Sequence, residues 1–151
     1  MILITGSAGF IGKSLVDHLV PNYKIIGIDD LSTGHPSNII RHKNYKFYKG
    51  NCADNKILQK IKNIKVIIHL AGQSSGEKSF EDPKIDFEKN VLTTVSLLDF
   101  AHKNKCKHFI FTSSMSVYGD NLKNKIKESN ITDPISFYGI SKLNAEKYIK
   151  K

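Results

Sequence analysis

The 151-residue chain is long enough for one domain with a single buried core and too short for two domains of ordinary size. No apolar run reaches the roughly 20 residues that a membrane-spanning helix needs, and the chain starts without a signal-peptide pattern, so we expect a cytoplasmic protein that contacts no membrane. The net charge is +9, but all basic residues except Arg41 are lysines scattered along the chain, which favours a solvated surface and disfavours nucleic-acid binding.

Five short apolar runs of strand length alternate with helical patterns. The expected strands cover residues 2–4, 25–28, 45–48, 66–70 and 109–111. Apolar residues at helical spacing follow at 10–19, 57–61, 91–98 and 143–149. Strands that alternate with helices predict a parallel sheet with helices on both faces, and the strand order expected for such a fold is 3-2-1-4-5.

Loop and boundary residues complete this prediction. Asp82 and Pro83 open the long third helix, and residues 121–134 form a polar loop. A doubly wound dinucleotide-binding sheet normally has six strands, whereas only five are found here before the chain ends at Lys151. We therefore interpret residues 1–151 as one α/β domain of the Rossmann type that is truncated before its sixth strand.

A glycine-rich run follows the first expected strand and opens a helix. Its residues are Gly6-Ser7-Ala8-Gly9-Phe10-Ile11-Gly12. Gly6 permits a tight turn, Gly9 lets the backbone approach a pyrophosphate, and Gly12 lets the helix pack closely on the strand. The helix N-terminus offers free N–H groups and a partial positive charge to the anion. A GxxGxxG pattern alone is a weak signal, and its place at a strand-to-helix junction strengthens the prediction of a dinucleotide site.

Two acidic residues, Asp29 and Asp30, end the second expected strand, with Asp29 lying 17 residues past Gly12. This spacing is typical of a carboxylate that accepts hydrogen bonds from the adenosine ribose. Its charge would repel a 2'-phosphate, so we expect NAD as the cofactor in preference to NADP. The alternative is that both residues only form the turn after the strand.

The fifth strand and the last helix carry a candidate catalytic set: Ser114 follows the strand, and Tyr138 and Lys142 are four residues apart on one helix face. A free tyrosine with a pKa near 10 is a poor base at neutral pH, but a nearby lysine charge favours the phenolate. A surface pair one turn apart is the alternative interpretation. The serine-rich segment at the end of a strand, where such sheets bind ligands, favours the catalytic one.

Six segments, in this order, resemble the extended short-chain dehydrogenase/reductases, specifically the NAD-dependent nucleotide-sugar epimerase and dehydratase group. The resemblance covers the whole chain. The segments are residues 5–12, residues 29–34 (DDLSTG), residues 69–73 (HLAGQ), Asn90, residues 112–119 (TSSMSVYG) and residues 138–142 (YGISK).

The resemblance implies roles for individual residues. In the cofactor site, Phe10 and Ile11 would offer backbone N–H groups to the pyrophosphate, and Asp29 would hold the adenosine ribose. Family members usually carry aspartate where Asn51 stands, so an amide would replace a charged acceptor beside the adenine. The remaining implied cofactor contacts are Cys52 beside the adenine, Leu70, Ala71 and Gly72 along the cleft, Asn90 next to them, and Lys142 on the nicotinamide ribose.

The family chemistry implied by the resemblance assigns the catalytic roles. Tyr138 would take a proton from a sugar hydroxyl, Ser114 would hydrogen-bond that oxygen, and a hydride would pass to the nicotinamide. In an epimerase the keto sugar turns over and receives the hydride on its other face. The dehydratases carry aspartate and glutamate where Met115 and Ser116 stand, so an epimerase similar to UDP-glucose 4-epimerase is favoured.

Several points stay open from the sequence. The family has a C-terminal region that contacts the substrate, and it is absent from this chain, so we expect a UDP-sugar without knowing which one. A nucleotide-sugar reductase or dehydrogenase is an alternative, as is a catalytically incomplete NAD-binding fragment. The helix around residues 85–103 pairs subunits in many family members, which implies a homodimer. Cys52 and Cys106 lie far apart and form no CxxC pair, so no metal site is predicted.

Overall fold

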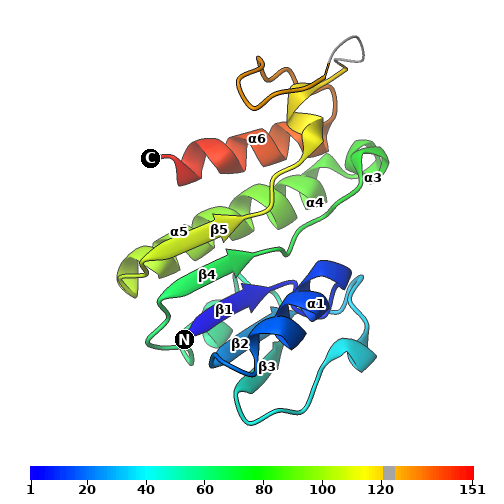
Figure 1. The fold of residues 1–151 in the computed structure, drawn as a ribbon. Helices are drawn as coiled ribbons and strands as arrows, with labels where there is room; N and C mark the ends of the chain where they lie inside the picture. Colours follow the sequence, from blue (N-terminus) through cyan, green and yellow to red (C-terminus); the bar gives the residue numbers. More distant parts are fainter. Residues whose placement is uncertain (121–124) are drawn as a thin grey trace. The chain divides into compact units, whose positions relative to one another are not determined.

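The five expected strands form one parallel sheet in the computed structural model of the protein, which describes residues 1–120 and 125–151. The strands are β1 (Ile2–Thr5), β2 (Ile25–Asp29), β3 (Tyr45–Lys49), β4 (Val66–His69) and β5 (His108–Phe111). Their order is β3-β2-β1-β4-β5, as predicted (Figure 1). Ile4 in β1 lies opposite Gly27 in β2 and Ile68 in β4. The carboxyl ends of β1 and β4 therefore meet where the strand order reverses, which is where such sheets bind ligands.

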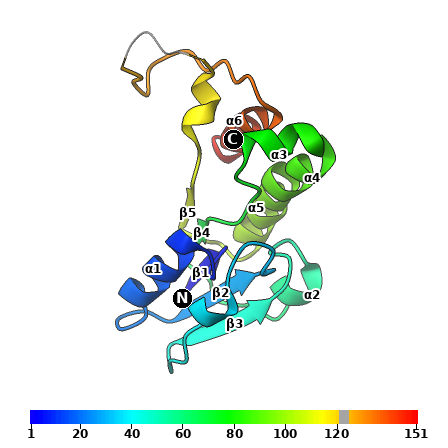
Figure 2. The same ribbon diagram turned by 90° about the vertical axis from the view of Figure 1, so that its right-hand side faces the viewer.

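Successive side chains along each strand point to opposite faces of the sheet, and each face is covered by its own hydrophobic cluster. Ile4 and Ile68 lie in one cluster with Val16 of helix α1 (Phe10–Leu19). Leu3 and Ile67, their neighbours in the chain, point to the other face. There they pack with α2 (Asn55–Leu58) and with the C-terminal part of α5 (Thr93–Lys103). Figure 2 shows α1 and α2 on opposite sides of the strands. Burial on both faces explains why the strands are nearly continuous apolar runs.

The chain divides into two compact units. The first comprises Met1–Ala71 and Ser96–Phe111, and it contains the sheet, α1, α2 and the short 3-10 helix η1 (Pro36–Asn38). The second comprises Gly72–Val95 and Thr112–Lys151. Its helices are α3 (Gly76–Glu81), α4 (Pro83–Phe87), the π-helical turn η2 (Glu88–Leu92), the 3-10 helix η3 (Met115–Tyr118) and α6 (Phe137–Ile149). The first four residues of the predicted loop 121–134 lie outside the described residues.

Polar side chains at the helix starts explain where the helices of the second unit begin. Asp82 accepts a hydrogen bond from the Ile85 N–H at 2.9 Å, and Pro83 takes the first helical position of α4, as the sequence predicts. Ser136 caps α6 in the same way, by accepting from the Gly139 N–H at 3.1 Å. These caps fix the registers of α4 and α6, the two helices that carry the buried ionisable groups of this unit.

The interior of the second unit is unusually polar. Its buried polar residues are Ser79, Asp86, Asn90, Thr93, Thr94, Ser141 and Lys142. The predicted long helix is interrupted there by η2, and the hydroxyls of Thr93 and Thr94 donate to the carbonyls of Lys89 and Asn90 at 2.6 and 2.7 Å. Polar burial is costly unless every group finds a partner, and π-helical turns are frequent at functional sites.

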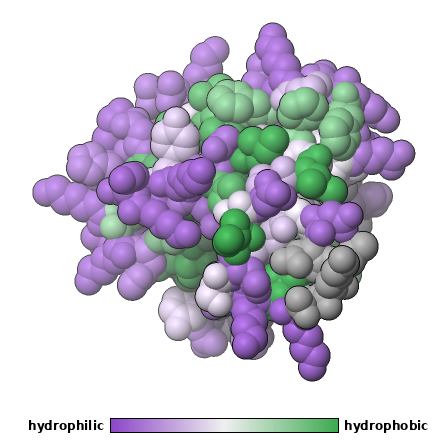
Figure 3. Space-filling view, turned by 90° about the horizontal axis from the view of Figure 1, so that it is seen from above, coloured by the Kyte–Doolittle hydropathy of each residue, from purple (hydrophilic) through white to green (hydrophobic). Residues whose placement is uncertain are grey.

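Hydrophobic side chains also reach the surface, where Figure 3 shows them in green among hydrophilic ones in purple. In the second unit, Ile85, Phe87 and Leu92 are each about half exposed on α4 and η2. No helix among the described residues combines the length and apolarity that crossing a bilayer requires.

Candidate functional site

The glycine loop between β1 and α1 has no room for side chains at its two ends. Gly6 has a φ of +68°, and a Cβ on it would lie 2.8 Å from the Ala71 backbone nitrogen. A Cβ on Gly12 would lie only 2.0 Å from the Gly6 carbonyl oxygen. The close packing of α1 on the loop therefore depends on glycine at position 12, as the sequence predicts.

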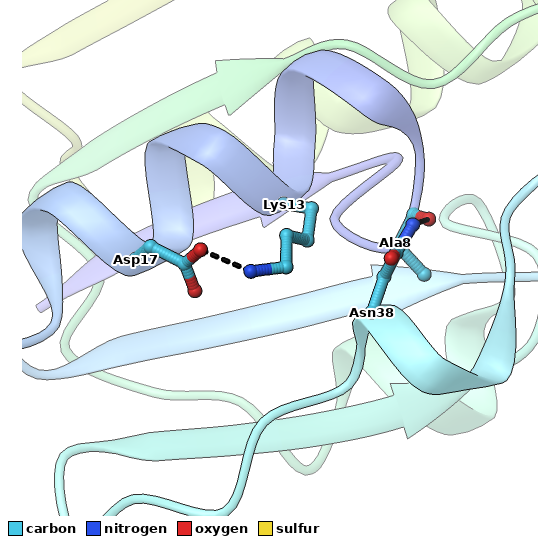
Figure 4. Close-up of polar contacts among 4 residues, drawn as sticks. All are labelled: Ala8, Lys13, Asp17 and Asn38. Atoms are coloured by element: carbon cyan, nitrogen blue, oxygen red, sulfur yellow. Dashed lines mark hydrogen bonds and ion pairs between the residues drawn. The ribbon is translucent and has the colours of Figure 1, made fainter.

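The N-terminus of α1 is open for an anion. Gly9 is its N-cap residue and has no side chain to cap the helix, and the first intrahelical bond runs from the Lys13 N–H to the Gly9 carbonyl at 2.9 Å. The N–H groups of Phe10 and Ile11 thus have no intrahelical partner. Further along the helix, Lys13 pairs with Asp17 (Figure 4), so this lysine is engaged one turn away from the loop. The start of α1 fits a diphosphate.

Asp29 at the end of β2 is 7 % exposed and is held by backbone groups on both of its oxygens. Oδ2 accepts from the Ala8 N–H at 2.9 Å, and Oδ1 accepts from the Leu31 N–H at 2.8 Å. A carboxylate has about four acceptor positions, so both oxygens can still accept from ribose hydroxyls. Asn38 donates to the Ala8 carbonyl at 2.7 Å (Figure 4), which ties the following loop to the glycine loop. The structure thus brings Asp29 and the glycine loop together.

Asp30 is exposed and accepts hydrogen bonds from the backbone and hydroxyl of Ser32, so its observed role is to form the turn. Beyond β3, the Gly50 N–H donates to the Asp29 carbonyl at 2.9 Å, which places the start of the Asn51 turn beside the end of β2. The Asn51 side chain accepts from the Ala53 N–H at 2.8 Å.

The Cys52 side chain is part of the hydrophobic core, and burial raises the pKa of its thiol to about 12. Any contact of Cys52 with the adenine would therefore come from its backbone. The predicted adenine contacts of Asn51 and Cys52 stay predictions.

Leu70 and Ala71 follow β4 at the same edge of the sheet as the glycine loop. The Ala71 N–H donates to the Thr5 hydroxyl at 3.2 Å, and this hydroxyl lies 2.7 Å from His69 Nδ1. This buried chain of hydrogen bonds fixes the backbone of Ala71 beside Gly6.

The candidate catalytic pair lies in the second unit. Tyr138 and Lys142 are 8 % and 4 % exposed, and Lys142 Nζ lies 5.8 Å from the centroid of the Tyr138 ring. Nζ donates to the Thr112 carbonyl at 3.1 Å. Burial lowers the pKa of Lys142 to about 8, and the nearby charge of Asp86 opposes this change. The structure therefore confirms that Tyr138 and Lys142 share one helix face, and it excludes a pair on the surface.

Ser114 is the N-cap residue of η3 and accepts from the Ser116 N–H at 3.2 Å. The two hydroxyls of Ser114 and Ser116 also lie 3.2 Å apart. A Cβ on Gly139 would lie 2.6 Å from the Ser116 carbonyl oxygen, so the serine segment approaches α6 closely because residue 139 has no side chain. The second unit thus packs the segment that carries Ser114 against the helix that carries Tyr138.

Gly72 and Asn90 lie beside Lys142. A Cβ on Gly72 would lie 2.4 Å from Asn90 Oδ1 and 3.6 Å from Lys142 Nζ. Asn90 is fully buried, and its amide donates to Asp86 Oδ1 at 3.0 Å. Gln73 donates to the same oxygen at 3.1 Å. Asp86 was not predicted from the sequence, although its spacing of four residues from Asn90 could have indicated a contact on one helix face.

The structure therefore assembles two groups of predicted residues, each within its own unit. The first unit holds the glycine loop, Asp29 and the ends of β3 and β4, and the second holds the serine segment, Asn90 and the Tyr138–Lys142 pair. Among residues 1–120 and 125–151, no cluster of three or more potential metal ligands occurs.

Comparisons with known proteins point to one family. Residues 2–151 match the model of the NAD-dependent epimerase/dehydratase family. A putative UDP-glucose 4-epimerase of Methanocaldococcus jannaschii is 38 % identical over 99 % of this chain and 50 % of the relative. A dTDP-D-glucose 4,6-dehydratase of Dictyostelium discoideum is 36 % identical over 99 % of this chain and 39 % of the relative.

A solved structure has the same fold over the same region. The UDP-N-acetylglucosamine 4-epimerase of Methanobrevibacter ruminantium, in complex with UDP-N-acetylmuramic acid, superimposes with a TM-score of 0.93 at 32 % identity. The superposition covers 99 % of this chain and 49 % of that structure. The chain thus spans about half the length of these relatives or less, and the cofactor predicted from the sequence, NAD, is the cofactor of the family.

Proposed function

Because the chain belongs to the NAD-dependent epimerase/dehydratase family, we propose that it is the NAD-binding and proton-transferring part of a UDP-sugar 4-epimerase. The observation that carries this proposal is the buried pair of Tyr138 and Lys142, with Nζ 5.8 Å from the ring centroid. A buried lysine is costly for stability, and a group whose pKa is perturbed by burial and by a specific charge is typical of a functional site. UDP-sugar epimerases among the similar proteins support the substrate class.

The residues present fit a dinucleotide. The N–H groups of Phe10 and Ile11 would bind the diphosphate at the start of α1, where Gly9 leaves the helix uncapped. Asp29 would accept from the hydroxyls of the adenosine ribose, because the backbone bonds to its two oxygens fix its orientation without filling their acceptor positions. Its negative charge would oppose a 2'-phosphate, so NAD is preferred over NADP.

Proton transfer is the work of the second unit. At pH 7 a lysine with a pKa of about 8 is about 90 % protonated, so Lys142 would act as a cation beside Tyr138. This charge favours the tyrosine phenolate, which can take the proton from a sugar hydroxyl. The Ser114 hydroxyl would hydrogen-bond the same sugar oxygen and hold it near Tyr138. When bound, NAD would supply the hydride-transfer chemistry that accompanies this proton transfer.

Epimerisation is favoured over dehydration by the two residues after Ser114. Water elimination needs an acid and a base next to the sugar, and Met115 and Ser116 provide neither. Met115 is 65 % exposed, and the Ser116 hydroxyl is 3.2 Å from that of Ser114. Ser116 therefore adds a second hydroxyl beside that of Ser114 and no acid or base.

The proposal is tested with Tyr138→Phe and with Tyr148→Phe as the matched control. Both tyrosines lie on α6, but Tyr148 is 54 % exposed and is not part of the proposed site. We expect Tyr138→Phe to abolish interconversion of UDP-glucose and UDP-galactose and to leave NAD binding within about threefold, while Tyr148→Phe behaves as the wild type. If the wild type is active, equal turnover by Tyr138→Phe would remove Tyr138 from the mechanism. A wild type without turnover would indicate the catalytically incomplete NAD-binding fragment. Net accumulation of a reduced or oxidised sugar with exchangeable NAD would indicate a reductase or dehydrogenase.

A further inference from the structure

Asp86 is a buried carboxylate that the proposed mechanism has not used. It lies in α4 and is 1 % exposed. Its Oδ1 accepts from the side-chain amides of Gln73 at 3.1 Å and Asn90 at 3.0 Å. Among the residues that the structure describes, its Oδ2 has no hydrogen-bond partner. A carboxylate in such surroundings is costly unless a nearby cation compensates its charge.

The two amides hold the Asp86 carboxylate in one orientation. The Gln73 amide also donates to the Ser75 carbonyl at 2.7 Å, and the Gln73 carbonyl oxygen accepts from the Ser75 N–H, so the side chain cannot turn without losing bonds. Asn90 lies one turn after Asp86, in the π-helical turn η2. With Oδ1 held by both amides, Oδ2 is the oxygen that remains to face a cation.

Lys142 is the buried cation whose charge interacts with that of Asp86. Among the described residues of the second unit, Asp86 and Lys142 are the buried side chains that carry full charges. α4 and η2, which carry Asp86 and Asn90, both pack against α6. Asn90 Oδ1 and Lys142 Nζ approach the same point, because they lie 2.4 and 3.6 Å from the position that a Cβ on Gly72 would take.

Other ionisable groups on the elements packed against α6 are more exposed. On α3, α4 and η2, the exposed charged residues are Glu77, Lys78, Glu81, Lys84 and Glu88, and Lys89 is half-buried. On η3, Tyr118 is half-buried. On α6, Glu146 is engaged by Ser113 and Lys150, and Lys147 is exposed. Tyr138, the proposed base, is the remaining ionisable group that faces Lys142. Solvent screens the exposed charges far more than it screens Asp86.

We propose that Asp86 is a positioning residue for Lys142, whose fixed carboxylate keeps the buried ammonium charged and in place beside Tyr138. The inference rests on the proposed function, in which Lys142 must be a cation. Burial alone lowers the pKa of Lys142, and the Asp86 charge opposes that effect. Without Asp86, Lys142 would lose its proton at lower pH, and Tyr138 would then lose the cation that favours its phenolate.

The test is a pH titration of Lys142 in the wild type, Asp86→Asn and Glu88→Gln. The NMR signal of the Lys142 side chain reports its protonation at each pH. Lys142→Arg identifies the signal by removing it. Asp86→Asn keeps the size of the side chain, and Glu88→Gln removes an equal charge from an exposed position two residues away. We expect the Lys142 titration to move to lower pH by about one unit in Asp86→Asn and to stay unchanged in Glu88→Gln. Asp86→Glu should return the titration toward the wild-type midpoint.

An equal midpoint in Asp86→Asn and Glu88→Gln would overturn the proposal. If Asp86→Asn lacks the wild-type circular dichroism spectrum, Asp86→Ser gives a second uncharged variant with a smaller side chain. Loss of the fold in both variants would assign Asp86 to the stability of α4 and would equally overturn the proposal. NAD binding is measured in the same samples. If the wild type does not bind NAD but the Lys142 midpoint still moves to lower pH in Asp86→Asn, the proposed function is refuted and this inference stands.

Discussion

Because Lys142 is buried, we expect the free energy of unfolding to increase with rising pH. The uncharged double variant Lys142→Met/Asp86→Asn should not show this increase. The pKa of Lys142 falls from 10.5 to about 8 in the folded protein. Between these values the unfolded chain keeps the proton that the folded protein has lost, so the free energy of unfolding rises with pH. The full change corresponds to about 3 kcal/mol, of which about 2 kcal/mol falls between about pH 7 and 9.5.

Urea unfolding followed by circular dichroism measures this contribution. The raised pKa of Cys52 acts in the opposite direction above about pH 9, but Cys52 is present in both proteins, so its effect cancels in the difference. We expect the wild type to gain about 2 kcal/mol relative to the double variant between pH 7 and 9.5. Parallel pH profiles of the two proteins would show that burial does not lower the pKa of Lys142.

Two further predictions concern the glycine loop and the surface of the second unit. Gly12→Ala should destabilise the fold because its Cβ would meet a backbone oxygen at 2.0 Å, whereas Gly9→Ala, with its nearest contact at 3.3 Å, should fold and mainly weaken NAD binding. Thermal unfolding and NAD titration of the two variants check this, and equal melting temperatures would contradict it. For the homodimer through residues 85–103 that the family resemblance implies, Leu92→Lys, which places a charge at a half-exposed apolar position, should shift sedimentation from dimer to monomer. A wild type that sediments only as a monomer at high concentration would reject the dimer.

The sheet could be predicted because its strands are buried on both faces and therefore read as apolar runs. The glycine loop and Asp29 could be predicted because local backbone geometry requires these residues at fixed spacing. The observed strands extend the predicted ones by a residue in most cases, as in β1, which includes Thr5, while β4 ends one residue earlier, at His69. Hydrogen bonds between the strands determine where each strand ends, and the pattern of apolar residues in the sequence does not indicate these bonds.

The polar interior of the second unit was not predictable in the same way. Asp86 stands in a stretch rich in charged residues, where a solvated helix face is the ordinary interpretation. Its burial follows from the packing of α4 and η2 against α6, which joins segments about 55 residues apart in the chain. The spacing of the apolar residues in the sequence also does not indicate the π-helical turn at Asn90. Similarly, Cys52 was expected beside the adenine, and only the structure places its side chain in the core.

Calorimetric titration of this chain and of Asp29→Asn with NAD and with NADP tests whether the start of α1 and Asp29 form an NAD site. We expect NAD to bind with at least about tenfold higher affinity than NADP, because a 2'-phosphate would face the Asp29 charge. In Asp29→Asn the affinity for NAD should fall and the two affinities should approach each other. No heat of binding with NAD, or equal binding of NAD and NADP by the wild type, would contradict an NAD site at Asp29 and the start of α1.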